Sequence, residues 1–565
     1  LKAQRARGPP GPRPGRQMPP GAGFLDGGLA PEDVARTTST ASLSSAVDLF
    51  NLNRASSASG AELRSESFLT ARSESNVSLD SERSPGLQGV AAAAARIVAH
   101  AAELAGPEAA AEMSAASTTI CRWLSPGACG ARELRPFRAK APAAALRIAV
   151  VVNGHQGDLQ PLVALTRCLV HYGHRVCIFT NANLVSFCWE RGVDALPVFA
   201  DSQAVLQSIG GVGRSRSEGT QKAGRAASEW LLANPRACTR VDDALSDLKP
   251  HALICGTQAS APCIRHEHRA MVPTIPVFLT REMLQQFEWL ACSQPPRPSF
   301  FPVSNFLDCE ELPAAAQLLR RTDEWALEEP AGSGEEPPDE LRRFLAAGPP
   351  PVAVGWGSTI AKRAPPPLML RLALGGLRAA GLRGVVLGGW ARLDELGMAV
   401  AQGGEEAEAT LDVPEAKELA AYAASQVCFV PTAPHAWLLP QCCCVVHHGG
   451  VGTTHAALRA GRPSVVTPVR GDQFAAAAAV RRHGAGFGFD APLHKITEEQ
   501  LASAISQALE AAMHVEELRL RFQQQAGEKR AAALINKFLR DDVVTGRWEH
   551  EFHQRALAAR RDERP

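Results

Sequence analysis

The sequence predicts an α/β protein in which two doubly wound parallel-sheet domains follow one another along the chain. Short apolar runs alternate with stretches of helical spacing in two series, and a Pro-, Glu- and Gly-rich stretch separates the series. Such alternation favours parallel strands joined by crossover helices. The predicted boundaries are a tail over 1–145, a first domain over 146–330, a linker over 331–345, a second domain over 346–545 and a charged tail over 546–565.

The composition limits the class of protein. Hydrophobic residues make up 45% of the 565 residues, which is enough for more than one sizeable core. The net charge of +1 gives no reason to expect a nucleic-acid partner. The 14 cysteines are scattered without a CxxC pair, so they indicate neither a disulfide framework nor a zinc site. No apolar run reaches the roughly 18 residues expected of a membrane-spanning helix.

The first 145 residues differ from the rest of the chain. Residues 1–22 are rich in Pro, Gly and Arg, and residues 37–85 are rich in Ser with interspersed Arg and Glu. Such segments bury too little apolar surface to offset the entropy of ordering, so we predict a disordered tail. The RSES-like repeats also fit a phosphorylation-regulated arm. The Ala-rich stretch 89–120 favours a helix that is marginal without packing.

The predicted strands of the first domain are continuous apolar runs, as expected of strands that are buried on both faces. They are the runs at 147–152, 174–180, 251–255 and 274–278. Residues 161–173 have helical spacing and follow the first run across the loop NGHQGD, so strand, turn, helix and strand form one parallel unit. Residues 290–350 show no such period and are predicted to be irregular.

The second domain repeats the pattern. Its predicted strands lie within 350–358, 384–389, 427–431, 443–448 and 463–469. Ligands of doubly wound sheets bind at the carboxyl ends of the strands. With two such domains facing each other, we expect the functional site in a cleft between them.

A Gly-rich corner follows the fourth of these strands, in the stretch VVHHGGVGTT. Its residues are, in order, His447, His448, Gly449, Gly450, Val451, Gly452, Thr453 and Thr454. The threonines are predicted to start a helix that stops at Gly461. A helix N-terminus presents free N–H groups and the positive end of the dipole, and glycines let a diphosphate come close. His448 is suited to donate to a phosphate oxygen. A metal site would need a third ligand that the sequence does not show nearby, and a tight corner without a ligand is the other alternative.

Asp472 and Gln473 follow the next strand and therefore belong to the same sheet edge. Carboxylate and amide groups bind the vicinal hydroxyls of a sugar. The alternative is a polar loop that caps the following helix, 474–484.

Two further strand ends contribute candidates. Ser358 follows the first strand of the domain, where its hydroxyl would reach the same phosphates. The Pro-rich loop 430–440 would form a stiff wall against a flat base, with ordinary core packing as the alternative for Trp437.

In the first domain, the loop 153–158 leads into a helix. Asp158 is placed as its N-cap, with Pro161 in the first turn. The alternative is a general base that takes a proton from an acceptor hydroxyl. His155 is the rival base, because imidazole titrates nearer neutral pH.

Together these stretches resemble a known family. VVHHGGVGTTHAALRAGRPSVVTPVRGDQ resembles the nucleotide-sugar signature of family 1 glycosyltransferases. Three further stretches resemble, more narrowly, the sterol 3-beta-glucosyltransferase branch: NGHQGDLQPLVAL, EEPPDELRRFLAAGPPPVAVGWGS and PHAWLLPQCCCVVHHGG. The resemblance covers about 147–285 and 335–540.

This resemblance implies a GT-B fold, a UDP-sugar donor and inversion at the anomeric carbon without a metal or other cofactor. By position, the donor-binding residues would be Gly157, Ser358, Val430, His448, Gly450, Val451, Gly452, Thr453, Asp472 and Gln473. Among them, Val430 would face the uracil, and Asp472 and Gln473 would hold the sugar hydroxyls. Asp158 would be the base.

The chain departs from the family pattern on the acceptor side. His155 and Gln156 replace the Thr and Arg of the GTRGD motif, and Ala436 replaces an acidic residue. The region 279–335 lacks some tens of residues, including a PWT-like stretch.

The function that the resemblance implies is transfer of glucose from UDP-glucose to the 3-beta-hydroxyl of a sterol or similar lipid alcohol. A non-catalytic nucleotide-sugar-binding protein and a glycosyltransferase for a non-sterol small molecule are the alternatives. A lipid acceptor would imply a cytoplasmic protein with peripheral membrane contact.

Overall fold

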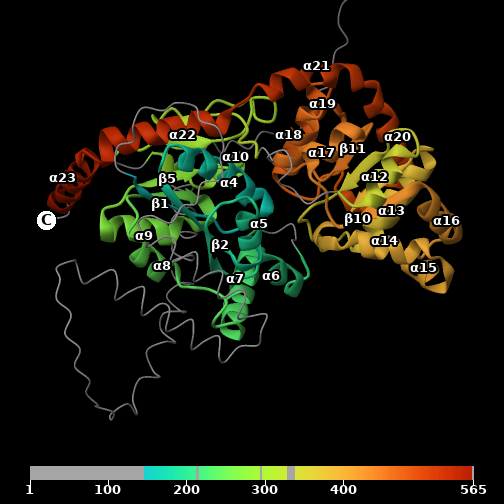
Figure 1. The fold of residues 1–565 in the computed structure, drawn as a ribbon, viewed down its shortest axis with the longest axis horizontal. Coiled ribbons are helices and arrows are strands. Elements are labelled where there is room, and N and C mark those ends of the chain that lie inside the picture. Colours follow the sequence, from blue (N-terminus) through green and yellow to red (C-terminus); the bar gives the residue numbers. More distant parts are fainter. Residues whose placement is uncertain (1–144, 212–215, 293–294, 328–336, 563–565) are drawn as a thin grey trace, which may run out of the picture. The chain divides into compact units, whose positions relative to one another are not determined.

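The computed structural model describes residues 145–211, 216–292, 295–327 and 337–562 (Figure 1). The predicted disordered tail and the predicted Ala-rich helix lie outside these residues.

Two parallel sheets form the frame of the described chain. The first has the strand order β3-β2-β1-β4-β5-β6-β7, and the second has the order β10-β9-β8-β11-β12-β13. Every printed strand pair in both sheets is parallel, and the strand order reverses beside the first strand of each series, as in doubly wound folds. The predicted fold class, two Rossmann-like parallel-sheet domains, is confirmed.

The strands of the first sheet are β1 (Arg147–Val151), β2 (Arg175–Asn181), β3 (Ala195–Phe199), β4 (Ala252–Gly256), β5 (Thr274–Val277), β6 (Ser299–Phe301) and β7 (Leu319–Arg321). Those of the second are β8 (Val352–Gly355), β9 (Gly384–Leu387), β10 (Val427–Val430), β11 (Cys444–His447), β12 (Ser464–Val466) and β13 (Gly486–Gly488). Val150 of β1 pairs with Ile178 of β2 and Ile254 of β4, and all three side chains are fully buried. Burial on both faces explains why these strands read as continuous apolar runs.

The prediction of irregular structure over 290–350 is wrong in part. Strands β6 and β7 lie there, and helix α12 (Asp339–Ala346) occupies part of the predicted linker. Three-residue strands are too short to show a period, and α12 exposes most of its side chains. Its Leu341 is fully buried in a cluster with Ala353 and Val385 of the second sheet.

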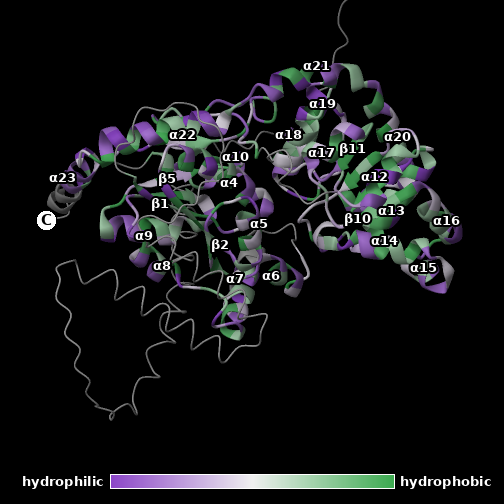
Figure 2. Cartoon of the chain, viewed as in Figure 1, coloured by the Kyte–Doolittle hydropathy of each residue, from purple (hydrophilic) through white to green (hydrophobic). Residues whose placement is uncertain are grey.

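Helices cover both sheets. In the first domain they are α4 (Gln156–His171), α5 (Val185–Glu190), α6 (Ser202–Ser208), α7 (Arg216–Ala233), α8 (Val241–Leu248), α9 (Ser260–Ala270), α10 (Arg281–Gln286) and α11 (Glu288–Ala291). After α12 come α13 (Pro366–Ala379), α14 (Leu393–Ala401), α15 (Gly404–Leu411), α16 (Ala416–Gln426), α17 (His435–Leu438), α18 (Val451–Arg459), α19 (Asp472–Arg482), α20 (Glu498–Glu510) and α21 (Ala512–Gln523). Strand β11 and helix α13 are mostly hydrophobic, whereas the polar residues gather on outer helices (Figure 2).

The last two helices return to the first domain. Helix α22 (Gly527–Phe538) lies beside α4 (Figure 1), and its Ile535 is buried in the core of the first sheet. Residues 546–565, predicted as a charged tail, contain helix α23 (Arg547–Asp562), whose Trp548 is buried in the same core. The composition of α23 is dominated by charged residues, so the burial of Trp548 could not be predicted from it.

Trp548→Ala should lower the free energy of unfolding by about 3–5 kcal/mol, because it removes a buried aromatic side chain that is only 3% exposed. Urea denaturation would measure this loss. The control is Met513→Ala, since Met513 is 84% exposed and its truncation should cost less than about 0.5 kcal/mol. Equal losses in the two variants would contradict the placement of α23 on the first core.

Candidate functional site

The corner after β11 is built around glycine. Gly449 has φ +89°, and a Cβ on it would lie 2.7 Å from Val466 Cγ1 and 2.9 Å from the Gln473 carbonyl oxygen. No other residue fits there, because both the backbone angle and the space require glycine. Helix α18 begins at Val451, two residues before the predicted start at Thr453, with Gly450 as its N-cap.

The N-terminus of α18 is open. No side chain caps Gly450, and Gly452 in the first turn is exposed. Because the first N–H groups of a helix have no partner within it, those of Val451, Gly452 and Thr453 are candidates for binding an anion. The helix ends as predicted, with Gly461 at φ +67° donating to the Leu458 carbonyl over 3.1 Å.

The two histidines of the corner differ in role. His447 is fully buried, and its Nδ1 accepts from the Gly449 N–H at 3.1 Å, so it supports the corner itself. His448 is half-buried, and its Nδ1 is a buried atom without a hydrogen-bond partner in the described part of the chain. Burial and then the nearby Arg470 lower the pKa of His448 to about 4, so its ring is neutral at physiological pH. The other ring nitrogen, Nε2, lies 2.5 Å from the position of a Cβ on Gly450, so the His448 ring borders the start of α18.

The loop after β8 lies next to His448. A Cβ on Gly357 would lie 3.7 Å from His448 Cε1, and Gly357 has φ +56°. The structure therefore brings the segment that carries Ser358 close to His448.

Asp472 and Gln473 begin helix α19 at the same sheet edge. The Gln473 Oε1 accepts from the N–H groups of Val469 and Arg470 at 2.7 and 3.0 Å, so this side chain holds the preceding loop, although no side chain caps the helix itself. Burial raises the pKa of Asp472 to about 6; Arg470 opposes this, and Glu282 and Asp158 add to it. Asp472 is thus a carboxyl group placed close to charges of the first domain.

Val430 and Trp437 take part in the packing of the second domain. The Val430 side chain is buried in a cluster with Leu341 and Leu438, and its carbonyl accepts from the Gly388 N–H at 2.9 Å. Trp437 packs against the same cluster, which is the alternative of ordinary packing.

The loop at the start of α4 differs from the predicted cap. The helix begins at Gln156, so His155 is the N-cap and Asp158 is the third helical residue. Asp158 Oδ2 accepts from the His155 backbone N–H at 2.8 Å and lies 3.2 Å from His155 Nδ1. Gly154 is required beside it, because a Cβ there would lie 2.2 Å from Asp158 Oδ2, whereas Gly157 faces open space. The two predicted catalytic residues are therefore in direct contact.

Electrostatics link this pair to the second domain. Burial raises the pKa of Asp158, but the hydrogen bonds and charge of His155, together with Arg470, outweigh it and bring that pKa below its usual value. Asp158 is therefore ionised at neutral pH. The influence of Arg470 on both Asp158 and His448 places the first-domain pair close to the α18 corner.

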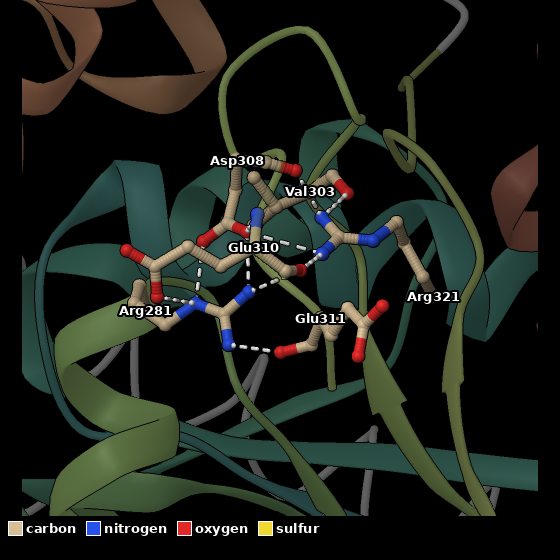
Figure 3. A network of polar contacts seen from close by, with 6 residues as sticks. All are labelled: Arg281, Val303, Asp308, Glu310, Glu311 and Arg321. Carbon is tan, nitrogen blue, oxygen red and sulfur yellow. Dashed lines mark hydrogen bonds and ion pairs between the residues drawn. The ribbon is translucent and has the colours of Figure 1, made fainter. Parts of the chain in front are cut away.

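The loop between β6 and β7 is tied down by two arginines. Figure 3 shows the guanidinium groups of Arg281 and Arg321 converging on the Asp308 carboxylate, with 2.6 Å from Arg281 Nε and 3.0 Å from Arg321 Nη2. Both arginines also donate to the Glu310 carbonyl, at 2.9 and 2.8 Å. Burial raises the pKa of Asp308, but the two arginines hold it below its usual value. The loop between β6 and β7 is thus held by several charge-assisted hydrogen bonds despite its irregular sequence.

The same region contacts the second domain. Ser304 Oγ lies 2.7 Å from His455 Nε2 in helix α18, and both residues are buried. Glu282, next to Arg281, has both carboxylate oxygens 3.2 Å from the position of a Cβ on Gly471. The loop between β6 and β7 contacts α18, and α10 approaches the start of α19.

Sequence reasoning missed three side chains at this site, namely Trp390, Arg470 and Glu282. Trp390 follows the strand end GVVLGG, and that position at a carboxyl edge is a signal that could have found it. Arg470 lies inside the quoted VTPVRGDQ stretch. Nothing in the sequence around Glu282 indicates its approach to Gly471.

Across the described ranges, no group of three or more His, Cys, Asp or Glu side chains is arranged to hold a metal ion. Nor does any helix in those ranges have the length and apolar character needed to cross a membrane.

Comparisons with known proteins agree with the motifs. Residues 398–532 match the family model described as the C-terminal domain of erythromycin biosynthesis protein CIII-like proteins. The chain is 27% identical over 420 residues to a sterol 3-beta-glucosyltransferase of Arabidopsis thaliana, covering 64% of this chain and 62% of that protein. It is also 27% identical over 429 residues to a sterol 3-beta-glucosyltransferase of Neosartorya fischeri, covering 68% of this chain and 28% of that protein.

The chain thus spans less than two thirds of the length of these curated relatives. Among solved structures, the spinosyn forosaminyltransferase aligns with a TM-score of 0.48 and 14% identity, covering 70% of this chain and all of that one. The predicted resemblance to glycosyltransferases, and to sterol 3-beta-glucosyltransferases in particular, is confirmed by the family and curated matches.

Proposed function

We propose that this protein is an inverting glycosyltransferase that moves a sugar from a UDP-sugar, with glucose as the leading candidate, to the hydroxyl of a sterol or similar lipid alcohol. The observation that carries the proposal is the His155–Asp158 pair in electrostatic contact with Arg470, beside the open N-terminus of α18 and the unpartnered His448. The names of the curated relatives support the choice of acceptor. We infer cytoplasmic residence and peripheral membrane contact only from the proposed lipid acceptor.

The donor would bind at the second sheet. The first N–H groups of α18 and a ring N–H of neutral His448 would hold the diphosphate, with the Ser358 hydroxyl beside them. Asp472 and the free amide of Gln473 would bind the sugar hydroxyls. The hydrogen-bond donors around the diphosphate would stabilise the negative charge that develops on the departing UDP.

The first domain would supply the base. Ionised Asp158 favours the His155 tautomer that donates from Nδ1, which leaves Nε2 as the acceptor of a proton. The His155 side chain is also the more exposed of the two, at 24% against 18% for Asp158. His155 Nε2 would take the proton of the acceptor hydroxyl while its oxygen attacks the anomeric carbon from the face opposite UDP. Asp158 would orient the ring and stabilise the imidazolium.

A panel assay tests this function. Purified full-length protein would be incubated with UDP-glucose and a sterol, a straight-chain alcohol or a polar aglycone, and both UDP release and glycoside would be measured. Sterol glucoside with equal UDP release is the expected result. UDP binding without turnover of any acceptor would overturn the proposal in favour of a non-catalytic nucleotide-sugar-binding protein.

One observation favours a second acceptor class. Glu282 carries a carboxylate to the edge of the site next to Gly471, where a sterol would meet a charged group. Glucosylation of the polar aglycone alone would assign the enzyme to a non-sterol, small-molecule acceptor.

Gly450→Ala should weaken UDP binding by about tenfold, because a Cβ on Gly450 would lie 2.5 Å from His448 Nε2 and displace the ring from the diphosphate. Isothermal titration with UDP would measure the change. The matched variant is Gly452→Ala, where a Cβ meets nothing within 4 Å and the backbone N–H is retained. Weaker UDP binding in Gly452→Ala than in Gly450→Ala would contradict the assigned role of His448.

A further inference from the structure

The loop after β9 is locked to two neighbouring loops of the second domain. Gly389 has φ +57°, and a Cβ on it would lie 2.3 Å from the Gly357 carbonyl oxygen. Its N–H donates to the Pro431 carbonyl at 3.1 Å, and the Trp390 N–H donates to the Gly357 carbonyl at 3.0 Å. The backbone of Trp390 is therefore fixed to the loop that lies against His448.

The side chain of Trp390 reaches the first domain. Its indole ring lies with its centroid 5.4 Å from that of the His155 imidazole, with the two planes tilted by 59°. This separation lies within the range in which aromatic rings attract each other. Trp390 thus contacts the proposed base, His155, through its ring and the loop of Gly357 through its backbone N–H.

We propose that Trp390 is a positioning residue, which holds the His155 imidazole against Asp158 and directs Nε2 toward the hydroxyl of the acceptor. This inference rests on the proposed function. Trp390 would connect the base in the first domain with the donor site in the second, because it sets the distance from His155 to the Gly357 loop beside His448.

The contact would also act selectively in the transition state. When His155 takes the acceptor proton it becomes a cation, and an aromatic ring attracts a cation more strongly than a neutral ring. An interaction that strengthens as the reaction proceeds raises turnover more than it raises substrate binding. The expected signature of Trp390 is therefore a loss of kcat with little change in the affinity for UDP.

A double-mutant cycle tests the inference. Trp390→Ala, Trp390→Phe and His155→Gln would be compared with both double variants, using kcat, KM for UDP-glucose and the Kd of UDP. We expect Trp390→Ala to lower kcat by about 10- to 100-fold, since misplacing a reacting group costs about this much, while the Kd of UDP stays within about twofold. Trp390→Phe should restore most of the loss. In the His155→Gln background, Trp390→Ala should cost less than about threefold, because the residue through which it acts is gone.

Three outcomes would overturn the inference. Equal costs of Trp390→Ala in the two backgrounds would mean that it does not act through His155. A rise in the Kd of UDP as large as the fall in kcat would mean that Trp390 binds the nucleotide instead. A wild-type protein that binds UDP but turns over no acceptor would overturn the proposed function and this inference together, and the wild-type assay separates that failure from the other two.

Discussion

Asp158→Asn is expected to lower turnover by about 10²- to 10⁴-fold, the usual contribution of a general acid–base group, while UDP still binds. The Asp158 carboxylate accepts from both the backbone N–H and the Nδ1 of His155, at 2.8 and 3.2 Å. An amide of the same size keeps the packing but removes the charge that selects the Nδ1–H tautomer and stabilises the imidazolium. Single-turnover kinetics and UDP titration on the same preparation would measure the two effects separately.

The matched control is Asp201→Asn in the same domain. Asp201 also holds a helix start, since its Oδ1 accepts from the Ala204 N–H at 2.8 Å, and it has no place in the proposed reaction. Asp201→Asn should therefore turn over at close to the wild-type rate. Full activity in Asp158→Asn would show that the pair with His155 is only a helix cap.

His448→Ala is expected to lower kcat by about 10²- to 10³-fold, as for the loss of one fixed donor to a developing negative charge. The ring is neutral at physiological pH because burial, and then the charge of Arg470, lower its pKa to about 4. Its Nε2 lies 2.5 Å from the position of a Cβ on Gly450, so the truncation removes the imidazole at the start of α18 that we propose holds the diphosphate. Steady-state kinetics with UDP-glucose would measure the loss.

Two variants make the His448 result specific. His448→Gln keeps an N–H donor at a similar reach and should recover part of the activity. His514→Ala removes a half-exposed imidazole on α21 and should leave kcat unchanged. If His448→Ala and His514→Ala behaved alike, the α18 corner would not be the diphosphate site.

The fold could be predicted where strands are buried on both faces. Strands such as β1 and β11 show as apolar runs because every side chain must avoid water. The three-residue strands β6 and β7 and the return of α22 and α23 to the first core could not be predicted. Their few buried residues, such as Trp548, lie within stretches that are otherwise polar or irregular.

The residues of the candidate site also differ in how far the sequence could predict them. His448, Asp158 and His155 could be predicted because each lies at a strand end or helix start, where local sequence fixes the backbone. Trp390 also follows a strand end, but its contact with His155 in the other domain could not be predicted, and neither could the approach of Glu282 to Gly471. Such contacts depend on tertiary packing, which no local pattern records.

The most direct test of the proposed reaction is the anomeric configuration of its product. The purified chain would be incubated with UDP-glucose and a sterol, and the isolated glucoside would be examined by NMR spectroscopy. Direct attack from the face opposite UDP, with His155 and Asp158 as the base, predicts the β-glucoside from the α-linked donor. An α-glucoside, or the absence of any glucoside from a protein that binds UDP, would contradict it.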